Sequence, residues 1–379
     1  MDERLIFSCS IAVVNWALDK KPIDGLMKEK LNNNVLTYVF KLLKFHGLSH
    51  LLYGFIRENQ IEVSNNLNLA IEKSYLKALT ESENIGFEYA RIVTALNNSK
   101  IKHVTLKGEY LKAFYNKDFI RPSCDVDILV LEKGVDEAVN ALKDNLEVVK
   151  AERNYHDVTI NLKSGVLVEL HFTLSENVKN LDAITKNYLN YIEKKSGEDY
   201  SYKFKNEFLI SYLVVHTAYH FYNGGAGLKP FIDLYLLKRG LSYNEEEVLS
   251  ILKNGNLTVF YKRVFDLIDV WFNGKAYNDI AIEMEKFIFN GGEYGSYYQT
   301  KSDKKGVIRK IFLPYKAMCN YYPILKKACV LYPFFIIARL FKGVFSKEKL
   351  QRAKKKIKSE KVSSFKKEKI ENLFKELNL

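Results

Sequence analysis

Strand-like segments in this chain are confined to residues 101–180, and helical patterns occupy both sides of that stretch. The strand-like segments are short runs rich in Val, Ile and Thr, which favour strands. They are IKHVTLKG, DVDILVL, EVVKAERN, HDVTINLKSG and VLVELHF, and the segments EYLKAFYN and GVDEAVNALKDNL between them have helical spacing. The order β-α-β-α-β-β-β predicts a small mixed sheet with helices packed on it, and therefore an α+β fold.

Helical regions flank this mixed stretch. Residues 68–100 have the spacing of one long amphipathic helix that stops at Asn97-Asn98-Ser99. From about Leu181 the pattern is helical again, with a Gly-rich turn at 224–227. We divide the chain into an N-terminal helical region (1–100), a mixed core (101–180), a helical domain (181–290), a linker with an apolar helical segment (291–345) and a basic helical tail (346–379).

The composition of the chain indicates the size of its core and its cellular compartment. The chain has 379 residues, of which 47% are hydrophobic, enough for a sizeable core. Its four cysteines are scattered without a CxxC pair, and the N-terminal residues lack the pattern of a secretory signal. These features predict a cytoplasmic protein with reduced thiols.

The positive charge is unevenly distributed. The formal net charge is +13, and residues 342–379 contain 13 Lys or Arg against 5 Asp or Glu. Such a tail can contact nucleic acid or acidic lipid, or it can be a solvated helix. The most apolar segment, 328–343, is interrupted by Arg339 and is short for a membrane span, so a buried or interfacial helix is expected. Peripheral membrane association through 328–358 is a further hypothesis.

Two aspartates stand at the head of an apolar strand-like run. Asp125 and Asp127 point to the same side of a strand, while Val126 and Ile128 would face the core. Glu169 lies in a similar setting, within VLVELHF. Buried carboxylates repel one another unless a cation lies between them, and oxygen ligands with open positions suit Mg²⁺. Three such acids on adjacent strands can hold two metal ions for displacement at phosphorus.

A second element could hold phosphates. In VTLKGEYL a strand runs into Lys107-Gly108 and a helix begins. Glycine permits close approach of the backbone to a phosphate, and the start of a helix offers N–H groups that are not yet hydrogen bonded. Lys107 adds a positive charge. Arg121, four residues before Asp125, could reach the same anion or simply pair with an acid.

These motifs together resemble the nucleotidyltransferase superfamily that includes DNA polymerase beta and kanamycin nucleotidyltransferase. More narrowly, LKGEYLKAFY followed by RPSCDVDILV and VELHF is similar to an uncharacterised bacterial nucleotidyltransferase family. HTAYHFYNGGAGLKPFIDLYLL and the late Pro- and Tyr-rich segment extend the resemblance over most of residues 1–345. The resemblance implies that the mixed sheet is a nucleotidyltransferase core flanked by helical regions.

The resemblance also implies roles for individual residues. Asp125 and Asp127 would be the metal-binding pair. Glu169 would be the third carboxylate and would help to deprotonate an attacking hydroxyl. Lys107 and Gly108 would contact a nucleoside triphosphate. The chain departs from the superfamily pattern in having Gly108-Glu109 where Gly-Gly or Gly-Ser is usual, and in a somewhat longer spacing to the aspartates.

Four further residues are candidate nucleotide ligands: His171, His220, Lys229 and Asp233. His171 shares a strand face with Glu169, where it would line the cleft or be a half-buried strand residue. His216 and His220 share one helix face; because HTAYH lacks the Glu of the HExxH motif, packing or substrate contact is favoured over zinc. Lys229 and Asp233, one turn apart, would form an ion pair or line the cleft.

The leading hypothesis is an Mg²⁺-dependent enzyme that transfers a nucleoside monophosphate from an NTP to an acceptor hydroxyl and releases pyrophosphate. A small molecule, a protein side chain and an RNA end all remain open as acceptors. The alternative is a non-catalytic module that keeps the fold and binds nucleotide or RNA.

Overall fold

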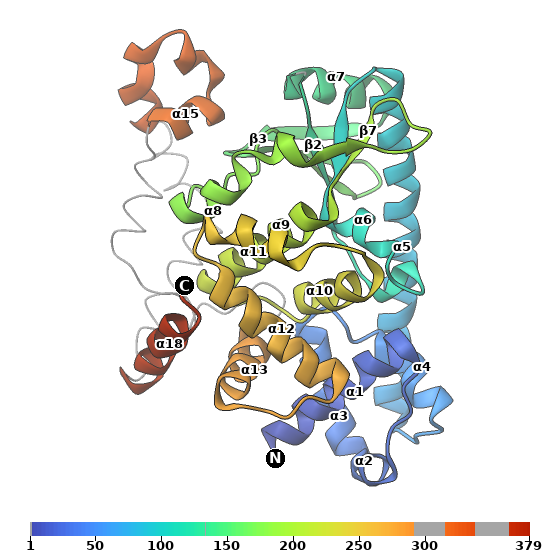
Figure 1. Cartoon of the computed structure of the whole chain (residues 1–379). Helices are drawn as coiled ribbons and strands as arrows, with labels where there is room; N and C mark the ends of the chain where they lie inside the picture. Colours follow the sequence, from blue (N-terminus) through green and yellow to red (C-terminus); the bar gives the residue numbers. More distant parts are fainter. Residues whose placement is uncertain (1, 133, 292–314, 338–363) are drawn as a thin grey trace.

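The computed structural model describes residues 2–132, 134–291, 315–337 and 364–379 (Figure 1). The polar, Gly-rich linker expected at 291–306 lies outside these residues except for Gly291, and so do the end of the apolar segment at 338–343 and much of the basic tail. Among the described residues, no helix combines the length and the apolar character that a membrane crossing requires.

Helices form the two flanking regions. The N-terminal ones are α1 (Glu3–Asp19), α2 (Gly25–Lys30), α3 (Asn33–Phe45), α4 (Leu51–Glu58) and α5 (Asn65–Asn98). Three helices lie between strands in the chain, α6 (Lys107–Lys112), α7 (Val135–Asn145) and α8 (Lys179–Thr185). The described helices after the last strand are α9 (Asn206–Tyr222), α10 (Lys229–Gly240), α11 (Glu245–Lys253), α12 (Thr258–Asn273), α13 (Asp279–Gly291), α15 (Tyr315–Tyr321) and α18 (Ser364–Glu376). Short 3₁₀ turns lie at Asp118–Ile120, Tyr188–Tyr191, Pro323–Lys326 and Cys329–Leu331.

The central sheet has seven strands in the order β3-β4-β5-β2-β1-β7-β6. Their bounds are β1 (His103–Thr105), β2 (Asp125–Val130), β3 (Val148–Arg153), β4 (Asp157–Leu162), β5 (Leu167–His171), β6 (Ile192–Lys194) and β7 (Ser201–Phe204). The β2–β5 and β1–β7 pairs are parallel, and the other pairs are antiparallel. The sheet is therefore mixed, as the sequence predicts.

Two strands were not expected. The helical pattern inferred from about Leu181 is wrong for residues 192–204, which form β6 and β7 at one edge of the sheet. These strands have three and four residues, and Glu193 and Lys194 are exposed. Segments so short and so polar lack the alternation of apolar residues that marks a half-buried strand.

The two faces of the sheet differ in chemistry. The side chains of Val126, Ile128, Val168 and Leu170 pack with residues of α5 and α7 in one buried cluster. Because side chains alternate along a strand, the residues between them point to the opposite face, which carries the acids of β2 and β5. The apolar face thus fixes the direction in which the acids point.

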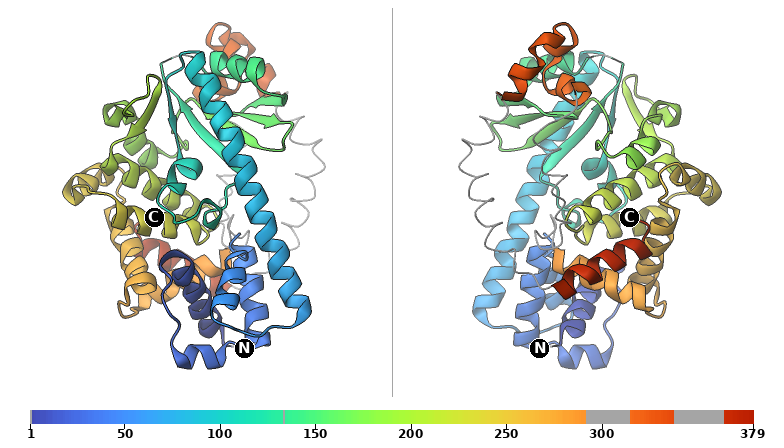
Figure 2. Two further views of the ribbon diagram at one scale, coloured as in Figure 1. Left: turned by 90° about the vertical axis from the view of Figure 1, so that its right-hand side faces the viewer. Right: turned by 90° about the vertical axis from the view of Figure 1, so that its left-hand side faces the viewer.

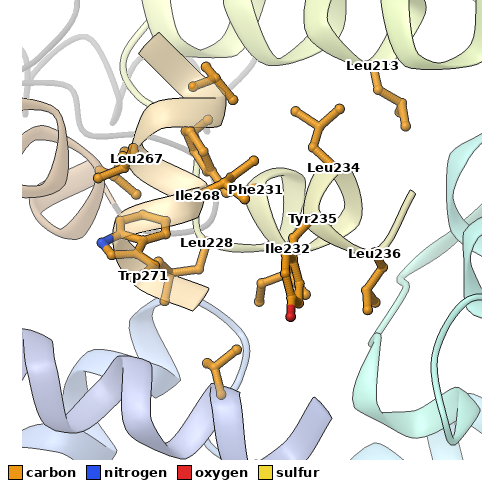
Figure 3. Close-up of a cluster of buried hydrophobic side chains, with 14 of the residues drawn as sticks. Leu213, Leu228, Phe231, Ile232, Leu234, Tyr235, Leu236, Leu267, Ile268 and Trp271 are labelled. Atoms are coloured by element: carbon orange, nitrogen blue, oxygen red, sulfur yellow. The ribbon is translucent and has the colours of Figure 1, made fainter. Parts of the chain in front are cut away.

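A second and larger core joins the N-terminal helices to α9, α10, α12 and α13. Figure 3 shows Phe231, Leu234 and Tyr235 of α10 between residues of α9 and α12. Pro230 in the first turn of α10 suits a helix start, where its missing N–H is not needed. The helices that cover the acidic face of the sheet are therefore anchored in this core.

The helix α5 connects the two cores. It has 34 residues and runs from the N-terminal helices to the sheet (Figure 2). Leu67 and Ile71 near its start belong to the larger core, whereas Ile92 and Leu96 near its end pack under the sheet. The long helix expected from the sequence and its end at Ser99 are confirmed.

Candidate active site

A pocket of about 420 Å³ lies between the acidic face of the sheet and the helices α9 and α10. It brings together all ten candidate site residues, which are Asp125, Asp127, Glu169, Lys107, Gly108, Arg121, His171, His220, Lys229 and Asp233. His216 lines it as well. The sequence separation of these residues reaches more than a hundred positions, so tertiary folding rather than local sequence assembles the pocket.

Strand register places the three acids side by side. In the parallel β2–β5 pair, Asp127 lies opposite Glu169, and Asp125 is two residues earlier on the same face. Asp127 is buried, whereas Asp125 and Glu169 are half-buried and open toward the pocket. The predicted shared face of the three carboxylates is therefore observed.

Asp127 is at the centre of the polar contacts. Its Oδ1 lies 3.0 Å from His171 Nε2 and 3.8 Å from Lys107 Nζ. Burial favours the neutral carboxyl, but Lys107 and His171 outweigh it and hold the pKa of Asp127 well below its usual range. Burial acts to lower the pKa of His171, but hydrogen bonds to Asp127 and Glu169 raise it to about 9. Asp127 is accordingly ionised, with cations already beside it.

Asp125 has the opposite electrostatic environment. Burial and repulsion from Asp127 and Glu169 raise its pKa to about 6, despite the opposing effect of Lys107 and Lys229. A carboxyl whose pKa is raised partly by repulsion from neighbouring acids lies in a site where an added cation would bind favourably.

Lys107 and Gly108 occupy the turn from β1 into α6. Lys107 has φ of 31°, a strained value for a residue with a side chain. A Cβ on Gly108 would collide with Ser123 Oγ unless that side chain moved, so the 121–124 loop lies close to the backbone at Gly108. The turn is thus packed tightly against the segment that leads into Asp125.

Arg121 and Asp233 form a buried ion pair at the side of the pocket. Arg121 Nε and Nη2 donate to Asp233 Oδ1 and Oδ2 at 2.7 and 2.8 Å. The Tyr115 hydroxyl donates to Asp233 Oδ1 at 2.6 Å. Lys229 Nζ donates to the Pro122 carbonyl at 3.3 Å. The role of Arg121 as a phosphate ligand stays a prediction, and the contact it makes here is with a carboxylate of α10.

The α9 wall carries residues that the sequence only partly indicates. His216 and His220 are in contact, with ring centroids 4.3 Å apart, as their spacing predicts. Burial and the nearby Lys107 and His220 lower the pKa of His216 well below its usual range, so its imidazole is neutral. Tyr212, one turn before His216, and Glu176, 3.8 Å from His216 Nδ1, also line the pocket.

Two groups of side chains in the described part of the chain have the spacing of metal ligands. One consists of Asp127, Glu169 and His171, whose ligand atoms lie within 4.8 Å of one another. The other consists of His156, Asp157 and His171. Asp157 lies opposite His171 in the β4–β5 pair, so the polar face continues from β5 onto β4. Asp125, which the sequence predicts as a metal ligand, belongs to neither group, and neither do His216 and His220.

A family model described as an uncharacterised nucleotidyltransferase matches residues 36–273. The chain belongs to this family. No curated protein and no solved structure matches it.

The matched segment of this nucleotidyltransferase family runs from α3 into the last residue of α12. It includes every residue that lines the pocket, from Lys107 to Asp233. The family is one of transferase enzymes, so the expectation of an enzyme is confirmed.

Several lining residues of this nucleotidyltransferase were missed from sequence. Tyr212 could have been found, because it precedes His216 by one helical turn. His156, Ser175 and Glu176 lie outside regular elements, where no periodicity indicates direction. Tyr115 contacts the pocket residue Asp233 rather than the pocket itself, and it gave no signal because Asp233 is 118 residues away.

Proposed function

We propose that the protein transfers a nucleoside monophosphate from an NTP to a hydroxyl acceptor and releases pyrophosphate. The observation that supports this most directly is the set Asp125, Asp127 and Glu169, which face one pocket next to the Lys107–Gly108 turn. Acids and cations gathered in one pocket suit a metal-assisted reaction of a polyphosphate.

The donor set fits Mg²⁺. The carboxylates supply oxygen ligands from two adjacent strands, and repulsion from its acidic neighbours contributes to the raised pKa of Asp125. Asp125, Asp127 and Glu169 would hold one or two ions. Bound Mg²⁺ would neutralise charge on the phosphates and align the attacking hydroxyl with the α-phosphorus.

The protein groups have distinct roles in this proposal. Lys107 and Lys229, together with the backbone at Gly108, would hold the triphosphate, and their fixed positions would reduce the entropic cost of alignment. Glu169, half-buried at the open side, would accept the hydroxyl proton. His171 would keep Asp127 oriented through the 3.0 Å hydrogen bond.

Two narrower assignments rest on the sequence motifs. The Lys-Gly turn, the Asp-x-Asp strand and the later Glu support placement in the superfamily of DNA polymerase beta and kanamycin nucleotidyltransferase, in a bacterial branch. Residues 101–180 would then be the catalytic core, with 181–290 closing the nucleotide cleft. A cytoplasmic location fits the scattered cysteines.

A non-catalytic nucleotide- or RNA-binding module is the second candidate. Two contacts favour it: Asp127 already has Lys107 and His171 beside it, so a cation must compete with both side chains. The acceptor in the leading proposal is a small molecule, a protein or an RNA end.

The deciding experiment measures pyrophosphate release and thermal stability with Mg²⁺ and each NTP in turn. A bound ligand raises the melting temperature in proportion to RT ln(1 + [L]/Kd). Asp125→Asn is the key variant, because removing a repelled charge should leave the protein at least as stable as before while abolishing turnover. Glu152→Gln, an exposed acid on β3, is the matched control and should remain active.

The outcomes separate the two candidates. Pyrophosphate release that requires Mg²⁺ and is lost in Asp125→Asn supports the enzyme. A melting shift without turnover, unchanged in Asp125→Asn, supports the binding module and contradicts the proposal. Labelled NTP incubated with the protein and a cell extract would then assign the acceptor, by the appearance of label in RNA, protein or small molecules.

A further inference from the structure

Residues 315–337 form a small unit beside the β3–β4 hairpin, away from the N-terminal helices (Figure 2). Met318, Cys319 and Leu325 are its buried centre, and Tyr155 of the hairpin packs against them. Arg153 Nε donates to the Asn320 carbonyl at 3.0 Å. The unit is therefore fixed to the sheet edge next to the pocket and has a defined inner side.

Its outer side is unusually apolar. Val330 and Phe334 are 78% and 67% exposed, and Ile324 and Ile337 are more than half exposed. Residues 332–337 are helical, and positions 330, 334 and 337 recur at the spacing of one helix face. Leu331, Phe335 and Ile336 pack inward against the centre of the unit. The unit thus has one apolar side packed inward and a second apolar side left exposed, which is the character of an interaction surface.

The charge of this described unit is one-sided. Residues 315–337 contain Lys316, Lys326 and Lys327 and no Asp or Glu. Lys326 and Lys327 are exposed and lie between the exposed apolar residues in sequence. Exposed apolar side chains beside lysines, in a segment that itself has no carboxylate, complement a surface that is negatively charged with an apolar layer beneath.

We propose that Ile324, Lys326, Lys327, Val330, Phe334 and Ile337 form a docking surface for anionic lipid bilayers, which holds the protein on a membrane without crossing it. This lipid-docking surface is independent of the reaction proposed above. A second copy of the chain is a poor partner, because two such cationic surfaces repel each other. RNA is less suited as well, because three of the four exposed apolar residues are aliphatic and cannot stack on bases.

Docking would place the pocket close to the bilayer. Tyr155, which packs on the unit, has its hydroxyl 3.4 Å from Ser175 Oγ, and Ser175 lines the pocket. An acceptor on or near the membrane would then reach the carboxylates without the protein leaving the surface.

Vesicle flotation of the full-length protein tests the proposal. The vesicles are phosphatidylcholine alone, or phosphatidylcholine and phosphatidylglycerol in equal amounts. We expect flotation with the anionic vesicles, and at least a roughly tenfold weaker binding for Val330→Ser with Phe334→Ser, because each buried apolar side chain contributes substantially. Lys326→Glu with Lys327→Glu should weaken binding by about tenfold or more, and added salt should do the same.

The control variant replaces exposed apolar side chains elsewhere on the surface of the protein. Leu69→Ser with Phe87→Ser on α5 replaces two side chains that are each 63% exposed, and it should bind vesicles as the wild type does. Melting temperatures equal to the wild type would establish that all three variants fold. The proposal is overturned if anionic vesicles do not bind, if Val330→Ser with Phe334→Ser binds normally, or if the control loses binding equally. Self-association or RNA binding that depends on these residues, without vesicle binding, would also overturn it.

Discussion

The buried contact between Arg121 and Asp233 allows a quantitative prediction. Asp233→Asn retains the side-chain shape but removes the negative charge, and Arg121 stays where it is almost fully buried. One amide oxygen can still accept a hydrogen bond, whereas the amide NH₂ would face a guanidinium donor. Removing one partner of a buried pair leaves an uncompensated charge, so we expect the free energy of unfolding to fall by about 3–5 kcal/mol.

Urea unfolding followed by far-UV circular dichroism measures this loss. Asp269→Asn is the matched control, because Asp269 pairs with Lys238 of the same helix α10 in a far more exposed setting. Exposed pairs contribute at most about 1 kcal/mol, so the control should stay within that range. A loss for Asp233→Asn no larger than that for Asp269→Asn would refute the reasoning.

A combined variant separates the charge from the packing. Replacing Arg121, Asp233 and Tyr115 together by Met, Leu and Phe removes the charges and the hydroxyl at once. Buried ion pairs replaced by apolar residues are often no less stable, so we expect recovery of most of the lost stability. Continued instability would show that the shape of the pair, and not its charge balance, holds α10 in place.

The remaining predictions concern packing and pH. Gly108→Ala would bring a Cβ to 2.4 Å from Ser123 Oγ and should cost about 1–3 kcal/mol, with recovery when Ser123→Gly is added. Gly86→Ala in α5, which meets no atom within 4 Å, should instead stabilise by about 0.5–1 kcal/mol, and a similar urea midpoint for the two Ala variants would contradict this contrast. Burial lowers the pKa of His46 and of His50 to about 4. Because the unfolded chain takes up protons near pH 6.5, stability should fall by about 3 kcal/mol per histidine as pH drops from 6.5 to 4. Unfolding measured across this range in His46→Gln should show a smaller slope, and an unchanged slope would contradict the assignment.

The parts of the fold that the sequence predicts are those with strong periodicity. The long helix α5 and the strands β2 and β5 have uninterrupted patterns, so their place and direction could be inferred. The alternation of acidic and apolar residues in DVDILV settles which side of β2 faces the core. Pairing of β2 with β5 then follows from the need to place Glu169 near the aspartates.

The parts that the sequence does not predict depend on distant partners. The pairing of Arg121 with Asp233 links residues 112 positions apart, and neither residue has a local pattern that reveals the other. Likewise β7 is held as a strand by β1, whose His103 lies opposite Ser201, and β6 is held by β7, rather than either by its own composition. Tertiary context overrides weak local preferences in such short edge strands.

The pocket lies where two cores meet, and this arrangement sets what the Arg121–Asp233 pair does. The acids belong to a sheet that packs on α7 and the end of α5, whereas α9 and α10 belong to the larger core. Contacts between the sheet and these helices fix the distance between the carboxylates and the opposite wall. Arg121 stands four residues before Asp125 and its partner is on α10, so the pair joins the segment that leads into the acids to that wall. Loss of the pair should therefore disturb nucleotide binding as well as stability, whereas loss of the more exposed Lys238–Asp269 pair should leave nucleotide binding unchanged and lower stability by at most about 1 kcal/mol.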